Sequence, residues 1–183
     1  MLRIVKDKAL SIHCRSKEVI LPLPEEDKKL LEEMIQYLRD SQDPKYQQSH
    51  PKVREGIGLA APQVGINKRM LVISYPTGEE DGSRVEHMLV NPEIISSSIR
   101  ECYLTGGEGC LSVDDPHPGY VYRSYRITVK ALEASTNSVV NIKASGYDAI
   151  VLQHEIDHLD GILFYDHINK KAPEEIKPGA VAI

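Results

Sequence analysis

The most constraining feature of this 183-residue chain is the segment VLQHEIDHLDG at 151–161, which contains an HExxH pattern. Its two histidines, His154 and His158, are four residues apart, and on an α-helix such residues lie one above the other on the same face. Both imidazoles can therefore reach one metal ion. Glu155 then lies beside the metal, where its carboxylate can accept a proton from a water molecule. The pattern predicts a buried metal-binding helix at 147–159 and hydrolytic chemistry.

A catalytic metal of this kind usually has three protein ligands and one open position, so a third ligand is needed. Metzincin proteases place another histidine six residues after the second one, where this chain has Phe164. Thermolysin-like enzymes use a downstream glutamate, but Glu174 and Glu175 lie in a proline-bounded tail. Cys110, in the segment GGEGCLSV, is a better candidate because its thiol lies among glycines, ahead of an apolar run. The predicted ligand set is one cysteine and two histidines.

Composition excludes several other classes of protein. The formal net charge is −5 and the isoelectric point is about 5.8, so we expect no basic surface for direct nucleic-acid binding. The N-terminal segment is charged, and no apolar run approaches the ~20 residues of a membrane helix. These features predict a cytoplasmic protein without a membrane segment. Three cysteines are an odd number for disulfides in such a reducing compartment, and metal ligation fits them better.

The length predicts one domain, residues 1–183, and a hydrophobic content of 41% is enough for a sizeable core. An apolar stripe predicts an amphipathic helix at 25–38, with solvated acidic residues at 25–27 in its first turn. The polar, proline-containing segment 40–55 is expected to be a long loop or an insertion. Runs of β-branched and apolar residues predict strands at 69–76, 85–95, 121–134, 138–143 and 180–183.

Asn91 and Pro92 are expected to bend or end the second of these strands. Many short strands and one buried helix predict an α+β fold, with antiparallel and mixed β-sheets packed around the central metal-binding helix.

Three blocks carry a resemblance to a known family: GIGLAAPQ at 56–63, EGCLS at 108–112 and QHEIDHLDG at 153–161. In their order and in their residues, the three blocks resemble the motifs of the peptide deformylases, and the likeness covers about residues 54–169. The sequence GEGCLSVDD and the long segment before the first block are similar to those of the Gram-positive, type 2 branch of the family. The N-terminal ALSIHCRSKEV is an imperfect version of a Pro-x-Leu-Arg-like element of the family.

The resemblance implies a metal-dependent hydrolase that removes the formyl group from the N-terminal formyl-methionine of newly synthesised proteins and releases formate. It implies one ion per chain, held by Cys110, His154 and His158. Ligand softness alone favours Zn²⁺, whereas the family implies Fe²⁺, which Zn²⁺ or Ni²⁺ often replaces in preparations. Its partners would be nascent formyl-methionyl peptides, and a transient ribosome contact is compatible with them.

Residue by residue, the resemblance makes Glu155 the general base, and the side-chain amide of Gln63 and the backbone N–H of Leu111 the donors to the developing oxyanion. Gly56 and Gly58 allow a backbone edge to approach an extended substrate, which could add as a strand.

Ile150 and Val151 lie one helical turn before His154 and, with Ile57, could line an apolar pocket suited to methionine. Arg123 and Glu108 fall at positions where the family carries an arginine and a glutamate, and the resemblance therefore implies a bidentate pair that could hold the Cys110 loop rigid.

Two other functions share part of this pattern. A zinc endopeptidase also contains HExxH, but it would cleave internal peptide bonds and would need a third ligand that we could not place. A non-enzymatic family member would bind the metal only for structure. Cys102 could complete such a closed Cys₂His₂ site.

Overall fold

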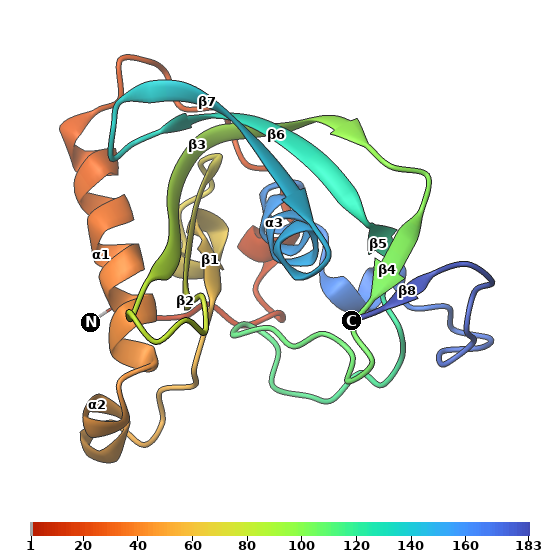
Figure 1. The fold of residues 1–183 in the computed structure, drawn as a ribbon. Coiled ribbons are helices and arrows are strands. Elements are labelled where there is room, and N and C mark those ends of the chain that lie inside the picture. The colour runs from red at the N-terminus through yellow and green to blue at the C-terminus, as the bar shows by residue number, and fades with distance from the viewer. Residues whose placement is uncertain (1) are drawn as a thin grey trace.

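The computed structural model describes residues 2–183, and it confirms an α+β fold with antiparallel and mixed sheets. A five-stranded antiparallel sheet curves around one helix (Figure 1), and its strands in spatial order are β1 (Gly58–Ala60), β2 (Met70–Pro76), β3 (Arg84–Ser97), β6 (Arg126–Glu133) and β7 (Ser138–Ser145). A smaller mixed sheet contains β5 (Arg123–Ser124), β4 (Glu101–Tyr103) and β8 (Val181–Ala182), with β4 and β8 parallel.

The helices are α1 (Glu25–Ser41), α2 (Pro44–Ser49) and α3 (Tyr147–Leu159), and short 3₁₀ turns occupy Leu10–His13, Ala61–Val64 and Phe164–His167. No helix formed by residues 2–183 is long and apolar enough to cross a membrane.

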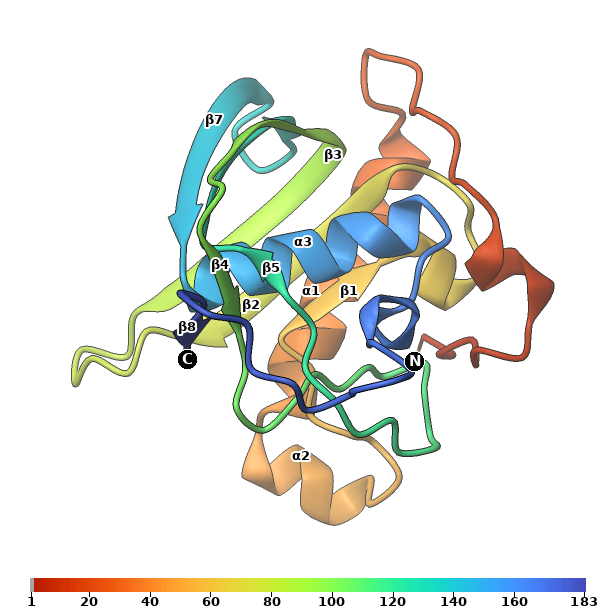
Figure 2. The same ribbon diagram turned by 90° about the vertical axis from the view of Figure 1, so that its right-hand side faces the viewer.

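The sheet is covered on both faces by helices, and β2 shows why. Successive side chains of a strand point to opposite faces. Leu71 and Ile73 face α3 and join one core cluster, whereas Met70 and Val72 face α1 and join another. The strand is therefore a continuous apolar run. Figure 2 shows α3 lying along the inner face of the curved sheet.

Helix α1 begins at the predicted residue and continues to Ser41, beyond the predicted end at 38. Of the stripe predicted from Leu30, Leu31, Met34, Ile35 and Leu38, all but the partly buried Leu30 are buried against the sheet. Asp27 differs from the expected solvated face. It is 3% exposed, and Lys68 Nζ lies 2.6 Å from its carboxylate, so it ties α1 to the start of β2.

The prediction of one long loop at 40–55 is wrong, because α2 lies within it. Asp43 caps this helix by accepting a hydrogen bond from the N–H of Lys45, and Pro44 occupies the first turn. Proline is well suited to that position, since its missing N–H would have no helical partner there. A helix of 6 residues is too short for its apolar residues to form a periodic pattern.

One predicted strand bends where expected, and another differs from expectation in a way that matters for the site. Strand β3 passes through Asn91 and Pro92 without ending, and a left-handed Asn91 with a shift in register bends it. The single strand predicted at 121–134 is divided between the two sheets, with β5 on the small sheet and β6 on the large one. This division places Arg123 of β5 near α3. The terminal strand predicted at 180–183 is present as β8.

An ion pair between α1 and β3 predicts a pH-dependent stability. Arg39 donates to both oxygens of Glu86, and Ser74 Oγ donates to Oε1 at 2.7 Å. The Arg39 hydrogen bond, with help from Ser74 and Arg84 and against the effect of burial, lowers the pKa of Glu86 from 4.5 to about 2. A depressed carboxyl pKa stabilises the fold above the unfolded pKa, and this contribution disappears as pH falls through the folded one.

We therefore expect Glu86→Gln to lower the free energy of unfolding by about 1–2 kcal/mol near pH 7. This value is smaller than the pKa shift alone implies, because Arg39 is partly exposed and water screens the ion pair. The difference from the parent protein should shrink between about pH 4.5 and pH 2. Urea unfolding across this range measures it, and Glu93→Gln, an exposed change on the same strand, is the control. A difference that does not vary with pH would contradict the assignment.

Candidate active site

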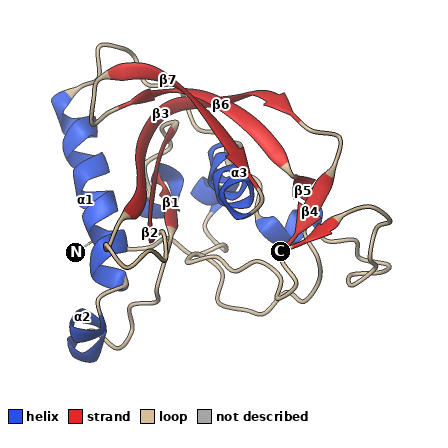
Figure 3. Cartoon of the chain, viewed as in Figure 1, coloured by secondary structure: helices blue, strands red, loops and turns tan. Residues whose placement is uncertain are grey.

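Three predicted ligands come together from two parts of the chain. His154 and His158 project from the same face of α3, with ring centroids 4.9 Å apart. Cys110 lies in the connection between β4 and β5, which Figure 3 draws as loop. One potential ligand atom from each residue lies within 4.8 Å of the other two, and His158 Nε2 is 3.3 Å from Cys110 Sγ. This group could hold a metal ion.

The surroundings of the cluster fit a metal. His158 is fully buried, and its Nδ1 has no hydrogen-bond partner among residues 2–183. His154 Nδ1 donates to Glu108 Oε2 at 2.8 Å, which leaves Nε2 as its free ring nitrogen. A carboxylate behind a histidine is a common way to orient a ligand ring. Cys102 is buried in β4 and is not part of the group, so the structure gives no support to a closed Cys₂His₂ site.

The predicted pair between Arg123 and Glu108 is present and is bidentate. Arg123 Nε and Nη2 donate to the two carboxylate oxygens at 2.6 and 2.9 Å, and Nη1 donates to Asp157 of α3 at 2.8 Å. Burial opposes the charge on Glu108, but hydrogen bonds from His154 and Arg123 outweigh it and lower its pKa to about 2. Arg123 thus links β5, the Cys110 loop and α3 behind the candidate ligand His154.

Replacing Arg123 with alanine is expected to destabilise the fold by about 3–5 kcal/mol and to weaken metal retention, because the buried carboxylate of Glu108 and the partly buried one of Asp157 would lose the arginine that pairs with both. Thermal unfolding and metal content after dialysis measure the two effects. Arg126→Ala, an exposed change three residues along the chain, is the control. If melting temperature and metal content both stayed at the parent values, Arg123 would not hold the loop.

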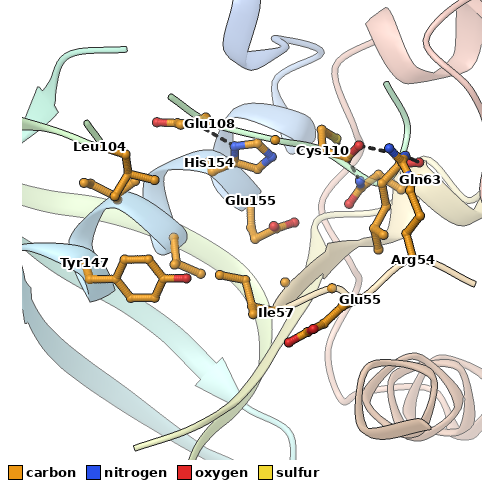
Figure 4. A pocket seen from close by; sticks show the side chains of 16 residues that line it. Arg54, Glu55, Ile57, Gln63, Leu104, Glu108, Cys110, Tyr147, His154 and Glu155 are labelled. Atoms are coloured by element: carbon orange, nitrogen blue, oxygen red, sulfur yellow. Dashed lines mark hydrogen bonds and ion pairs between the residues drawn. The ribbon is translucent and has the colours of Figure 1, made fainter. Parts of the chain in front are cut away.

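Glu155 lies against this cluster inside a cavity of about 480 Å³. Its side chain is 4% exposed, and Oε2 has no hydrogen-bond partner among the described residues. Burial raises the pKa of Glu155 to about 7. Figure 4 shows its carboxylate pointing into the cavity between His154 and Ile57. A buried carboxylate without a structural partner is suited to proton transfer.

The side-chain amide of Gln63 has a fixed orientation. Its Oε1 accepts a hydrogen bond from the N–H of Ala60 at 2.8 Å. Nε2 therefore faces Cys110 Sγ, at 3.4 Å, and Ser112 Oγ, at 3.3 Å. The amide N–H group is thereby aimed at the cluster, where a donor to a developing oxyanion would be needed.

One edge of β1 is open to the cavity. Ile57 C=O accepts from the N–H of Ser74 on β2, so the alternation of an antiparallel strand turns the N–H and C=O of Gly58 to the opposite side. A Cβ on Gly58 would lie 2.3 Å from Glu155 Oε1. Glycine is therefore required here by the close approach of the carboxylate.

The cavity contains nearly all of the predicted site residues: Ile57, Gly58, Gln63, Cys110, Leu111, Ile150, Val151, His154 and Glu155 line it, and His158 lies buried behind them. Sequence reasoning missed four further lining side chains, namely Arg54, Glu55, Leu104 and Tyr147. Helical spacing from Ile150 and Val151 could have identified Tyr147, one turn earlier on α3. No comparable signal marks Leu104.

Comparison with known proteins identifies the family. Residues 1–174 match the family model for polypeptide deformylase. The chain is 44% identical to the peptide deformylase of Macrococcus caseolyticus over 183 residues, covering 100% of this chain and 98% of that protein. It is 50% identical to peptide deformylase 2 of Bacillus cereus over 167 residues, covering 89% of each. Bacillus relatives of this kind support the predicted Gram-positive branch.

Solved structures agree. A Met-Ala-Ser-bound class I type b peptide deformylase from Acinetobacter baumannii has a TM-score of 0.71 at 31% identity, with 92% of this chain and 98% of that chain covered. Peptide deformylase from Thermotoga maritima has a TM-score of 0.70 at 32% identity, with the same coverage. The chain therefore belongs to the peptide deformylase family, as its three sequence motifs predicted.

Proposed function

We propose that this enzyme depends on a metal ion and removes the formyl group from the N-terminal formyl-methionine of newly synthesised proteins. It hydrolyses the amide bond between the formyl carbon and the methionine nitrogen and releases formate. One observation carries the proposal. The cavity brings a group of one thiol and two imidazoles together with a buried carboxylate, Glu155, that has no structural partner among residues 2–183. Family membership supplies the substrate class, and the arrangement of these groups supplies the chemistry.

Cys110, His154 and His158 would hold the ion. When bound, a divalent metal supplies Lewis acidity, which polarises a carbonyl group and favours the deprotonation of water. Glu155 is placed to accept the proton of the attacking water and then to donate it to the departing amine of methionine. The N–H groups of Gln63 Nε2 and of Leu111 would donate to the oxygen that becomes negative on the formyl carbon.

The open edge of β1 and the apolar wall of the cavity would bind the substrate. The free N–H and C=O of Gly58 can pair with an extended peptide, which would add to the sheet as a strand. Ile57, Ile150 and Val151, together with Tyr147, would surround the methionine side chain. A relative in Acinetobacter baumannii has been solved with Met-Ala-Ser bound, which supports a tripeptide of this type as a ligand.

We propose Fe²⁺ as the native ion, with Zn²⁺ or Ni²⁺ able to replace it. A thiolate ligand and Fe²⁺ together predict loss of activity on exposure to peroxide, through oxidation of the ion and of Cys110. Protein loaded with Zn²⁺ or Ni²⁺ should lose activity more slowly. We expect the enzyme to act in the cytoplasm, where nascent chains are made, and a transient ribosome contact remains a prediction.

Formate release from formyl-Met-Ala-Ser tests the function, with protein purified without oxygen and loaded with Fe²⁺. Acetyl-Met-Ala-Ser is the substrate control, and a peptide with a blocked N-terminus and internal methionine tests the endopeptidase alternative. Formate release that chelation abolishes and Fe²⁺ restores would support the proposal. Cleavage of the internal peptide without formate release, or no hydrolysis by folded, metal-loaded protein, would overturn it.

A further inference from the structure

The loop that carries Cys110 is held by donors from outside the loop that bind its backbone carbonyls. The carbonyls of Cys110, Leu111, Ser112 and Val113 each accept a hydrogen bond from Arg54 or from residues 6 and 7. Arg54 donates to three of the four, with Nη2 to Cys110 O at 2.9 Å and Nη1 to Val113 O at 3.0 Å. Figure 4 shows Arg54 on the same side of the cavity as Gln63 and Cys110.

The N-terminal segment completes this arrangement. Lys6 Nζ donates to Leu111 O at 3.1 Å, and the N–H of Asp7 donates to Ser112 O at 2.9 Å. Asp114, at the end of the loop, lies 2.7 Å from Lys6 Nζ and 3.4 Å from Arg54 Nη2. The two cations are therefore kept next to the same stretch of backbone.

Holding these carbonyls also fixes the N–H groups of the same peptides. In a trans peptide the C=O and the N–H point in opposite directions. The C=O of Leu111 faces Arg54 and Lys6, and the N–H of the same peptide, on Ser112, points the other way and lies 3.4 Å from Cys110 Sγ. By the same geometry, the C=O of Cys110 faces Arg54, so the N–H of Leu111 is directed away from Arg54.

The N–H of Leu111 is the group assigned above to the developing oxyanion. It makes no hydrogen bond within residues 2–183, and Leu111 lines the cavity. A cationic donor on the carbonyl of a peptide polarises that peptide and makes its N–H a stronger donor. Arg54 thus acts on the proposed oxyanion donor through a single peptide group, since it binds the carbonyl of the peptide whose N–H belongs to Leu111.

We propose that Arg54 is a positioning residue for deformylation: it orients and polarises the Cys110–Leu111 and Leu111–Ser112 peptides, with Lys6 supporting the second of them. The N–H of Leu111 is thereby aimed at the oxyanion and the N–H of Ser112 at the Cys110 sulfur. This inference rests on the proposed function. Arg54 acts through the backbone, so its removal affects the transition state more than the binding of substrate.

Steady-state kinetics of Arg54→Met, Arg54→Lys and Lys6→Met test the inference, with metal content measured on every sample. We expect Arg54→Met to lower kcat by about 10- to 100-fold, less than deletion of an oxyanion donor, and to change KM by less than about threefold. Arg54→Lys should recover part of the loss, and Lys6→Met should lose less because Arg54 still holds the same carbonyl. Lys52→Gln removes an exposed positive charge from the same segment and is the control.

Two substrates separate this role from direct substrate binding. Formyl-Met-Ala-Ser is compared with its C-terminal amide, since a guanidinium that bound the substrate carboxylate would act only on the free acid. An Arg54→Met effect confined to KM of the free acid would overturn the proposal. An unchanged kcat in metal-loaded Arg54→Met would also overturn it. If Arg54→Met does not retain one ion per chain, the kinetics of the free acid and of the amide are compared in Arg54→Lys instead.

Backbone amide resonances give a readout that does not depend on activity. In ¹⁵N spectra of the Zn²⁺-loaded protein, the Leu111 and Ser112 amide signals should shift in Arg54→Lys and stay in place in Lys52→Gln. If the parent protein released no formate, the proposed function would fail. The two amide signals would still show whether Arg54 orients and polarises the Cys110–Leu111 and Leu111–Ser112 peptides. Unshifted Leu111 and Ser112 signals in Arg54→Lys would overturn the inference with the proposed function intact.

Discussion

Replacing Glu155 with glutamine is expected to lower kcat for formate release by about 100- to 10,000-fold while the protein keeps its metal ion. Glutamine has nearly the same shape as glutamate, but it cannot accept the proton of the attacking water. The proposed ligands Cys110, His154 and His158 should remain in place, because Glu155 is not one of the three clustered donors. Activity and metal binding should therefore separate in this variant.

The surroundings of Glu155 predict that the change will not destabilise the fold. One carboxylate oxygen has no hydrogen-bond partner within residues 2–183, and burial raises the pKa of this side chain to about 7. Both features mean that the folded state gains little from the ionised group. Removing an unpaired buried carboxylate should leave the melting temperature unchanged or raise it.

The measurement combines formate release, metal content and thermal unfolding on Glu155→Gln and on Glu174→Gln. Glu174 is exposed in the C-terminal tail, so its change controls for the loss of a carboxylate elsewhere. A Glu155→Gln protein with one ion per chain and kcat within about threefold of the parent would remove Glu155 from the proton-transfer role. Loss of the metal would show that Glu155 supports the ligands.

The long helices and the central strand could be predicted from sequence because their environment repeats along the chain. The apolar stripe of α1 produces a periodic pattern, and α3 is marked by its HExxH motif and its largely apolar composition; both helices begin at the predicted residue. Helix α2 could not be predicted in this way, since its stability depends on the Asp43 cap and on its neighbours. Six residues contain too few turns for a pattern.

Contacts between distant segments explain most of what the sequence did not show. The predicted strand at 121–134 looks continuous, yet β5 pairs with β4 and β6 pairs with β3. Which sheet each half joins depends on partners tens of residues away. Arg54 was missed for the same reason: its acceptors lie 56 to 59 residues further along the chain.

The candidate ligands and Glu155 were easier to identify, because HExxH places three of the groups on adjacent turns of one helix. Cys110 was proposed as the third ligand from its place among glycines, and the family resemblance supported that choice, because no local pattern predicts contact between this thiol and the helix. The structure brings the loop to α3 through Arg123 and Glu108, a pair that the resemblance also indicated.

Gly58→Ala is expected to lower kcat by about 100-fold, because the added methyl group would occupy the space of the Glu155 carboxylate. An ideal Cβ at this position lies 2.3 Å from Glu155 Oε1 and 2.7 Å from its Cδ. Because Glu155 is buried, its side chain has little room to move aside, and displacement by about 1 Å is enough for a loss of this size. The backbone of residue 58 lies outside the left-handed region, so alanine fits its conformation.

A double variant shows whether the methyl group acts through Glu155. If it does, Gly58→Ala should cost much less in a Glu155→Gln background than in the parent protein, because effects of residues that act as a unit are not additive. Gly106→Ala is the matched control, since a Cβ there has no neighbour within 4 Å and the residue lies outside the cavity. Equal fold-losses in both backgrounds would mean that Gly58 serves the substrate edge of β1 instead, and KM for formyl-Met-Ala-Ser should then rise. A kcat within about twofold of the parent would show that the carboxylate can move without loss of function, and its buried position would not be what sets the rate.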